Sequence, residues 1–194
     1  MSPALWVLLL SGPVEAPAAV ADEQSWTIPS LHALGLMTTM RLGEAVIWPE
    51  PFADTDLARM GRSYEAAYTQ PPKWDSSRRA FEWDGDPWWV NSIGHALFGS
   101  ELYLRARTCH HGVLPALAFT AIGSTVWEYG FEANGVRPSA LDLWYTPAAG
   151  LVLGEARYQG WRLARGIGNR TWRGLLTSVL DPFGELERWA GTKC

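Results

Sequence analysis

The chain has 194 residues, of which 47% are hydrophobic and 19% are charged, and its formal net charge is −4. This composition can bury a hydrophobic core, which excludes an intrinsically disordered tail. A dedicated nucleic-acid-binding protein usually presents a basic face, so the acidic balance argues against that class too. We therefore expect a folded domain whose partners are not nucleic acids.

The first residues differ from the rest of the chain. An apolar run from Ala4 to Leu10 is followed by small residues that end at Ala21. This ending fits the small-x-small pattern that precedes cleavage by signal peptidase, although no lysine or arginine comes before the apolar run. The pattern predicts an export signal over residues 1–21.

Helical periodicity dominates the remainder, and alternating strand patterns are scarce. We predict an all-α fold, a compact bundle of five or six helices, and we keep association with a membrane as an open alternative. The expected helices cover 30–47, 54–68, 88–107, 112–133, a segment from 139 onward and 155–180. The predicted organisation is a signal peptide at 1–21, N-terminal helices and a linker at 22–80, and a core helical domain at 81–194.

Capping residues indicate where these helices begin. Ser30 is the expected N-cap of the first helix, and Asp54 or Thr55 that of the second. Asp86 followed by Pro87 is a favourable helix start, so we expect Asp86 to cap the helix over 88–107 rather than to bind a metal.

Polar or small residues recur every four or eight positions on three consecutive predicted helices, so each helix presents them on one face. Helices joined by short turns pack as antiparallel neighbours, and the three stripes could therefore meet. The stripes consist of Asn91, His95 and Tyr103, then Ser124, Glu128 and Glu132, then Asp142, Thr146, Gly150 and Gly154. We expect the glycines, with Gly99, to let neighbouring helices approach closely.

Two interpretations of the stripes remain open. A hydrogen-bond network that fixes the helix register would bond His95 to Glu128, because unpaired buried polar groups are costly. Alternatively, a histidine beside carboxylates is a common general base, which makes His95, Glu128 and Asp142 the candidate catalytic residues. The candidate binding or network residues are Asp86, Asn91, Ser100, Tyr103, Ser124, Glu132, Ser139, Thr146 and Glu155.

Cofactor chemistry has little support in the sequence. His95 with Glu132 and Asp142 could hold a divalent metal, but the chain has neither a His-Glu-x-x-His nor a Glu-x-x-His pattern. No Gly-x-Ser-x-Gly elbow is present for nucleophilic catalysis. We predict no cofactor and keep the divalent metal as an alternative.

Two segments bear on membrane association. Residues 113–127 contain no charged side chain, but they are fewer than the roughly 20 apolar residues that a membrane span needs. This indicates a buried or partly immersed helix. Residues 155–180 mix arginines with Trp161 and Trp172, which fits either a solvated face or a basic amphipathic segment on anionic lipid. The predicted partner is membrane lipid or an envelope protein.

An ordered set of motifs spans Phe81 to Glu155. The motifs are Asp84-Gly85-Asp86-Pro87, Asn91 to His95, Gly99-Ser100, Ser124 to Tyr129, Glu132, Pro138-Ser139, Asp142, Thr146-Pro147, Gly150 and Gly154-Glu155. This set resembles a family of bacterial envelope proteins of unknown function, whose members typically carry an export signal. The resemblance implies an exported location and a helical fold, and it implies no activity. A looser similarity is to VanZ-like and YfiM-like helical envelope proteins.

Together these patterns predict an exported protein, located in the periplasm or at the outer membrane of a bacterium, with a structural or partner-binding role. A membrane-associated hydrolase or transferase that acts on a lipid or envelope component is the alternative. The sequence leaves open whether Cys109 and Cys194 pair in an oxidising compartment.

Overall fold

The computed structural model describes residues 24–192 and residue 194. Within this part the chain forms eight α-helices and two π-helical segments and contains no strand, which confirms the all-α prediction. The predicted export signal at 1–21 lies outside the described residues. None of the helices described has the length and hydropathy that a membrane span requires.

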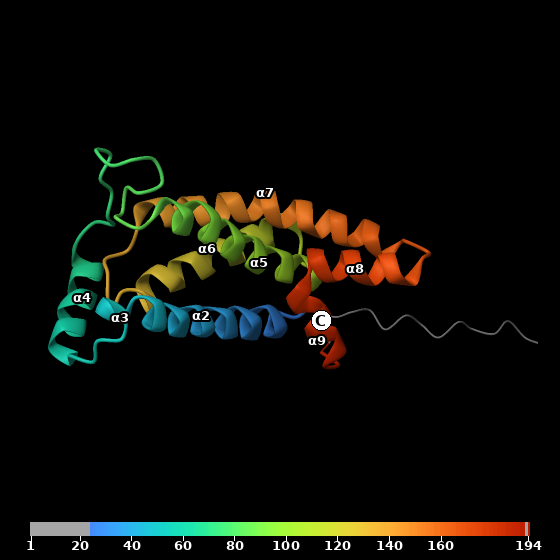
Figure 1. Cartoon of the computed structure of the whole chain (residues 1–194), viewed down its shortest axis with the longest axis horizontal. Coiled ribbons are helices and arrows are strands. Elements are labelled where there is room, and N and C mark those ends of the chain that lie inside the picture. Colours follow the sequence, from blue (N-terminus) through green and yellow to red (C-terminus); the bar gives the residue numbers. More distant parts are fainter. Residues whose placement is uncertain (1–23, 193) are drawn as a thin grey trace, which may run out of the picture.

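Three helices form the centre of the bundle (Figure 1): α5 (His95–Thr108), α6 (Val113–Val126) and α7 (Ala140–Arg165). α5 and α7 run in the same direction, because His95 bonds to Thr146 and, further along both helices, Tyr103 bonds to Glu155. α6 runs antiparallel to both, as the short α5–α6 connection predicts.

Small residues let α5 and α7 approach closely. A Cβ atom added to Gly150 would lie 2.7 Å from the carbonyl oxygen of Gly99, and one added to Gly154 would lie 2.8 Å from the Cδ1 atom of Tyr103. These separations are too short for a side chain, so the expected role of the three glycines in close helix packing is confirmed.

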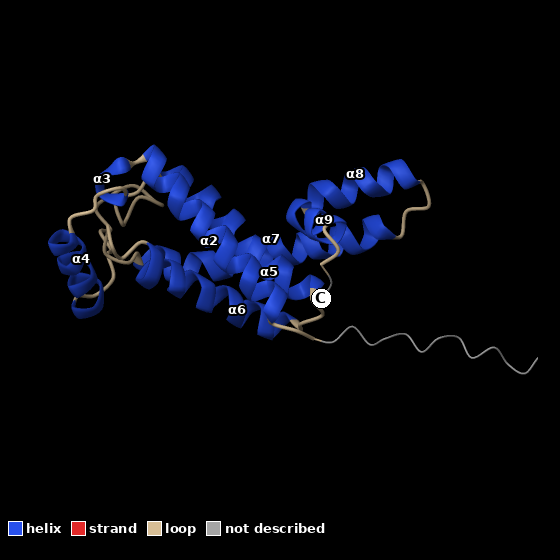
Figure 2. Ribbon diagram, turned by 90° about the horizontal axis from the view of Figure 1, so that it is seen from below, coloured by secondary structure: helices blue, strands red, loops and turns tan. Residues whose placement is uncertain are grey.

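The N-terminal helices line the bundle and close one end of it (Figures 1 and 2). They are α2 (Thr27–Ile47), α3 (Pro49–Phe52) and α4 (Leu57–Thr69). α2 packs Ala33 and Met37 against Phe98, Leu102 and Trp127 of the core.

Two expected caps of these helices were wrong. α2 begins three residues before Ser30, whose amide N–H already donates to the carbonyl of Trp26. The cap of α4 is Asp56, because its carboxylate accepts hydrogen bonds from the N–H groups of Ala58 and Arg59.

The C-terminal part folds back on the core. α7 continues through Pro147 to Arg165, and α8 (Arg170–Leu180) returns along it before α9 (Pro182–Trp189). The helix expected over 155–180 is therefore interrupted at 166–169, where glycines weaken it. Cys109 and Cys194 are joined by a disulfide, with their Cα atoms 4.8 Å apart.

The two π-helical segments adjoin the central helices: η1 (Val90–Gly94) leads into α5, and η2 (Trp127–Phe131) follows α6. The helices expected over 88–107 and 112–133 are present but contain these wide turns. Asp86 is not the cap of the first, since the carbonyl of Pro87 accepts the first helical bonds, from the amides of Val90 and Asn91. Single π turns occur frequently at functional sites.

Candidate functional site

The three polar stripes converge where η1, η2 and the start of α7 meet. His95, Glu128 and Asp142 each offer a potential ligand or hydrogen-bonding atom, and these atoms all lie within 4.8 Å of one another. All three side chains are buried. The structure therefore brings together the three residues that the sequence suggested as catalytic.

Hydrogen bonds across helices hold this polar cluster. The Nδ1 atom of His95 lies 2.9 Å from the hydroxyl of Thr146 and 3.6 Å from Oδ1 of Asp142. The amide of Ser139 donates to Oε2 of Glu128 at 2.7 Å. The hydroxyl of Ser124 donates to the main-chain carbonyl of Asp142 at 3.0 Å. The partner of His95 is thus Thr146 on α7, and not Glu128 as the network hypothesis expected.

Asp84 is a member of the cluster that we did not select from the sequence. Its carboxylate accepts hydrogen bonds from the side-chain amide of Asn91 at 2.7 Å, from the amide of Asp86 at 3.0 Å and from the hydroxyl of Ser139 at 2.5 Å. Gly85 has a φ of 108°, which lets the loop turn back after Asp84. The Asp-Gly-Asp-Pro motif drew attention to this loop in the sequence. We expected Asp86, and not Asp84, to be the residue of the motif with a structural role.

The buried surroundings of the cluster disfavour the charged form of several of its carboxyl groups. Burial, together with the charges of Glu128 and Asp84, raises the pKa of Asp142 to about 10. Burial also raises the pKa of Glu128 to about 8 and holds that of Glu132 well above its usual range. His95 has its pKa lowered to about 4 by burial, so its imidazole is neutral at neutral pH.

A further carboxyl reaches the cluster from α2. Glu44 adjoins Glu132, and burial raises the pKa of Glu44 to about 6. No periodic pattern marked Glu44 in the sequence, because it is one acid on a mostly apolar helix. Its position depends on how α2 packs, which sequence periodicity does not give.

The other expected network residues lie further along α5 and α7. The hydroxyl of Tyr103 donates to Glu155 at 2.8 Å, and the guanidinium of Arg107 bonds to the same carboxylate. The hydroxyl of Ser100 accepts a hydrogen bond from Arg157 at 2.7 Å. None of these groups bonds to His95, so the predicted set divides between the first polar cluster, around His95, and the polar groups further along the helices, which we call the second cluster.

A buried ion-pair network continues from the second cluster and was not predicted. Arg105 pairs with Asp181 at 3.0 Å and with Glu187 at 3.1 Å, and Arg157 pairs with Glu101 at 2.7 Å. Glu101 and Arg105 stand four residues apart on α5, a spacing typical of helix ion pairs. That spacing was a usable signal, but it could not show that both side chains are buried.

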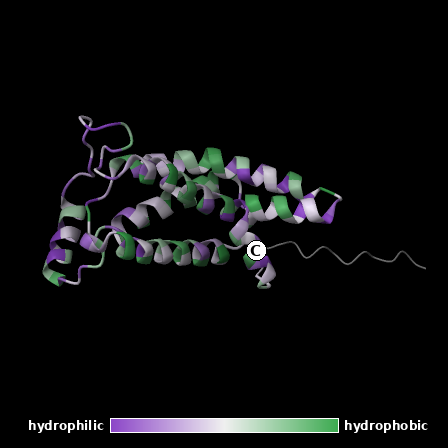
Figure 3. Cartoon of the chain, viewed as in Figure 1, coloured by the Kyte–Doolittle hydropathy of each residue, from purple (hydrophilic) through white to green (hydrophobic). Residues whose placement is uncertain are grey.

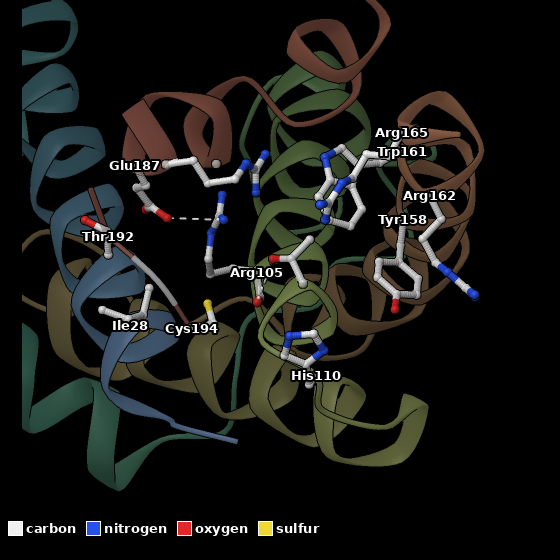
Figure 4. Close-up of a pocket in the computed structure, with 13 residues that line it drawn as sticks. Ile28, Arg105, His110, Tyr158, Trp161, Arg162, Arg165, Glu187, Thr192 and Cys194 are labelled. Carbon is white, nitrogen blue, oxygen red and sulfur yellow. Dashed lines mark hydrogen bonds and ion pairs between the residues drawn. The ribbon is translucent and has the colours of Figure 1, made fainter. Parts of the chain in front are cut away.

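A cavity lies at the far end of α5 from His95 (Figure 4). It has a volume of about 940 Å³, and it is lined by residues of α7, which include Trp161 and Arg165, and by residues near the C-terminus, which include Glu187 and Thr192. An apolar groove of about 530 Å³ runs between α2 and the α8–α9 connection. Neither space is lined by His95, Glu128 or Asp142, so the first polar cluster is closed.

The order of these features along the chain matches one known family. The family described as "Domain of unknown function (DUF3943)" matches residues 80–183. The chain belongs to this family. The DUF3943 region begins just before the loop that carries Asp84 and ends in α9, so it contains His95, Glu128 and Asp142. No curated protein and no solved structure matches the chain.

Proposed function

We propose that this DUF3943 protein is an exported domain that binds the membrane surface of the bacterial cell envelope, with its buried polar network acting as the scaffold. The observation that carries the proposal is the distribution of side chains between interior and surface. Asn91, Glu128 and Asp142 are among the fully buried side chains, while many large apolar side chains are exposed. Buried polar groups and extensive exposed apolar surface are the informative departures from ordinary globular proteins.

The exposed apolar side chains form an organised surface on α8. Trp172, Leu175 and Val179 are 59%, 52% and 68% exposed, and their spacing of three and four residues places them on one face. Figure 3 shows that hydrophobic residues occur along α8 and also along α2 and α7. Arg170 and Arg173 lie on the same helix, so apolar and basic groups occur together, as in helices that rest on anionic lipid.

The apolar groove continues this surface. Val179 and Phe183 line it on one side, and Leu36 and Met40 of α2 line it on the other. A hydrophobic groove next to a basic helix suits a lipid, whose acyl chain and anionic headgroup require those two environments. This arrangement favours a lipid surface over a soluble envelope protein as the partner.

Two further features support an envelope location. The apolar run before Ala21 has the pattern of an export signal, and a disulfide joins Cys109 to Cys194. Disulfides persist in oxidising compartments such as the periplasm and are rare in the cytosol.

Vesicle sedimentation tests this proposal. The purified chain should co-sediment with vesicles that contain anionic phosphatidylglycerol and less with vesicles of phosphatidylcholine alone. The double substitution Trp172→Glu and Leu175→Glu should abolish binding, because it places charges where the helix meets the lipid. Leu57→Glu is the matched control, since Leu57 is 80% exposed on α4. Equal binding of both variants, or no binding by the native chain, would overturn the proposal.

The convergence of His95, Glu128 and Asp142 within 4.8 Å supports a second candidate, a hydrolase or transferase acting on a lipid. A general base must reach its substrate, so this function requires the closed cluster to open. Glu128→Gln should then abolish turnover of a phospholipid while the far-UV circular dichroism stays native. Undiminished turnover in that variant would contradict the catalytic assignment.

A further inference from the structure

The carboxylates of the first polar cluster are not fully paired. Oε1 of Glu128 and Oδ1 of Asp142 are both buried and accept no hydrogen bond. Each side chain is only 1% exposed, so water does not compensate for the missing partners. An unpaired buried carboxylate oxygen is costly, and its retention calls for a specific reason.

Cations do not neutralise these groups either. Among residues 24–192, neither Glu128 nor Asp142 forms an ion pair with a lysine or arginine, and the side-chain neighbours of Asp142 are His95 and the carboxyl group of Asp84. The second cluster is different, because Glu101 and Asp181 are both paired with arginines. Within the described residues the two buried acidic sets therefore differ in one respect: arginines pair with Glu101 and Asp181, whereas no lysine or arginine pairs with Glu128 or Asp142.

The donor atoms are spaced for one ion. The atoms contributed by His95, Glu128 and Asp142 lie within 4.8 Å of one another. Bonds from zinc to nitrogen and oxygen are about 2.0–2.2 Å, so two donors on one ion lie at most about 4.4 Å apart. The separations in the structure exceed that limit by at most about 0.4 Å, a difference that ion binding would have to close.

We infer that His95, Glu128 and Asp142 form a site for one divalent transition-metal ion. An imidazole with two carboxylates is a mixed nitrogen and oxygen donor set, which suits Zn²⁺, Mn²⁺ or Fe²⁺ better than Ca²⁺. The ion joins α5, η2 and α7, and it supplies the positive charge that the cluster lacks. This inference does not depend on membrane binding.

The surroundings provide the groups that orient metal ligands in other proteins. Thr146 bonds to Nδ1 of His95, and the amide of Ser139 holds Oε2 of Glu128. The bond to Glu128 fixes Oε2 and leaves Oε1 available, and Oδ1 of Asp142 is available as well. Asp84 supplies a neighbouring carboxylate that is itself anchored by Asn91 and Ser139. Because the site is buried, we expect the ion to be acquired during folding or slow opening.

Metal uptake by the full chain tests the inference. The purified protein is unfolded in chelator and refolded with Zn²⁺, Mn²⁺ or Ca²⁺, and the bound metal is measured by mass spectrometry. We expect about one Zn²⁺ or Mn²⁺ per chain and a higher melting temperature with either ion. A native chain that retains none of these ions, or that retains Ca²⁺ preferentially, overturns the proposal.

Substitutions locate the ion within the chain. Asp142→Asn and Glu128→Gln should each weaken binding by at least about tenfold. Glu101→Gln removes a carboxylate that is also buried, but in the arginine-paired network, and should leave binding unchanged. Equal binding by all three variants would place the ion elsewhere.

A measurement on the native chain covers the case in which these variants do not fold. Pulsed electron paramagnetic resonance of the Mn²⁺-loaded protein should detect coupling to one imidazole nitrogen. Loss of that coupling in His95→Gln, with the other three histidines of the chain intact, assigns it to His95. Absence of nitrogen coupling in the native protein contradicts the proposed ligand set.

Discussion

Glu101 shows how a single buried charge is stabilised in this protein. Burial opposes its ionisation, but contact with His32 and the charge and hydrogen bond of Arg157 outweigh burial and lower the pKa of Glu101 to about 2. The carboxylate is therefore more acidic in the folded chain than in the unfolded one, where its pKa is near 4.5. Ionised Glu101 stabilises the folded state above that pH.

The resulting pH dependence is testable. The stabilisation by Glu101 should be complete above about pH 5 and should disappear as the pH falls towards 2. The native chain should be more stable than Glu101→Gln at neutral pH by about 3 kcal/mol, and this difference should shrink with acid. Urea unfolding at a series of pH values measures it. Glu65→Gln on the exposed face of α4 is the control, and a difference that is independent of pH would refute the assignment.

Close packing of α5 against α7 governs stability at the scale of elements. A Cβ atom on Gly99 would collide with the main-chain carbonyl of Thr146, which cannot rotate away as a side chain can. Gly99→Ala should therefore lower the free energy of unfolding by at least about 2 kcal/mol, as overpacking does. Thermal and urea unfolding would measure the loss.

Gly35→Ala is the matched control for that substitution. Nothing lies within 4 Å of a Cβ atom at Gly35, which is also inside a helix, so the change should raise stability by about 0.5–1 kcal/mol. Opposite signs at the two glycines are the expected result. A stable Gly99→Ala variant would show that α5 and α7 are further apart than described.

The helices and the meeting of the stripes could be predicted because both follow from periodicity. Apolar and polar residues at helical spacing indicated the positions of α5, α6 and α7. The same spacing predicted that His95 and Asp142 could lie close together, as they do. The π turns at η1 and η2 could not be predicted, because a wide turn inserts one residue without changing residue types. The exact partner of His95 depends on that insertion, which explains why Thr146 replaced Glu128.

Contacts from other elements were beyond prediction for a different reason. Asp84 approaches from a loop and Glu44 from α2, and no local pattern states where such a segment docks. The caps at Ser30, Asp54 or Thr55 and Asp86 failed because several polar residues compete near each helix start. Cap preference identifies suitable residue types, but tertiary packing selects among them.

At the scale of the whole molecule, the two polar clusters follow one another along the length of the bundle. The first lies at the start of α5 and α7, and the second lies along their later turns, next to α8 and α9. α8 and α9, which carry the proposed lipid surface, are thus held by arginine ion pairs, whereas η2 and α7 are held around His95. We expect changes at one end to leave the other end folded.

The disulfide lies at the end of the bundle that contains the second polar cluster, and it stabilises that end. Cys109 and Cys194 are 85 residues apart in sequence, and in the chain-entropy description closure of so long a loop stabilises the fold by about 4.6 kcal/mol. Cys109→Ser, or reduction of the native chain, should lower the free energy of unfolding by about that amount. Urea unfolding with and without reductant measures the effect, and an unchanged midpoint would contradict it.

The same bond also makes α6, α7, α8 and α9 into a covalent ring that closes just after α5. A protease that nicks the glycine-containing connection at 166–169 would open the ring without releasing a fragment. The nicked protein would keep its full mass on a non-reducing gel and separate into two pieces only after reduction. In a protease-rich compartment, cleavage of one peptide bond in this connection would therefore leave the C-terminal helices attached to the rest of the molecule.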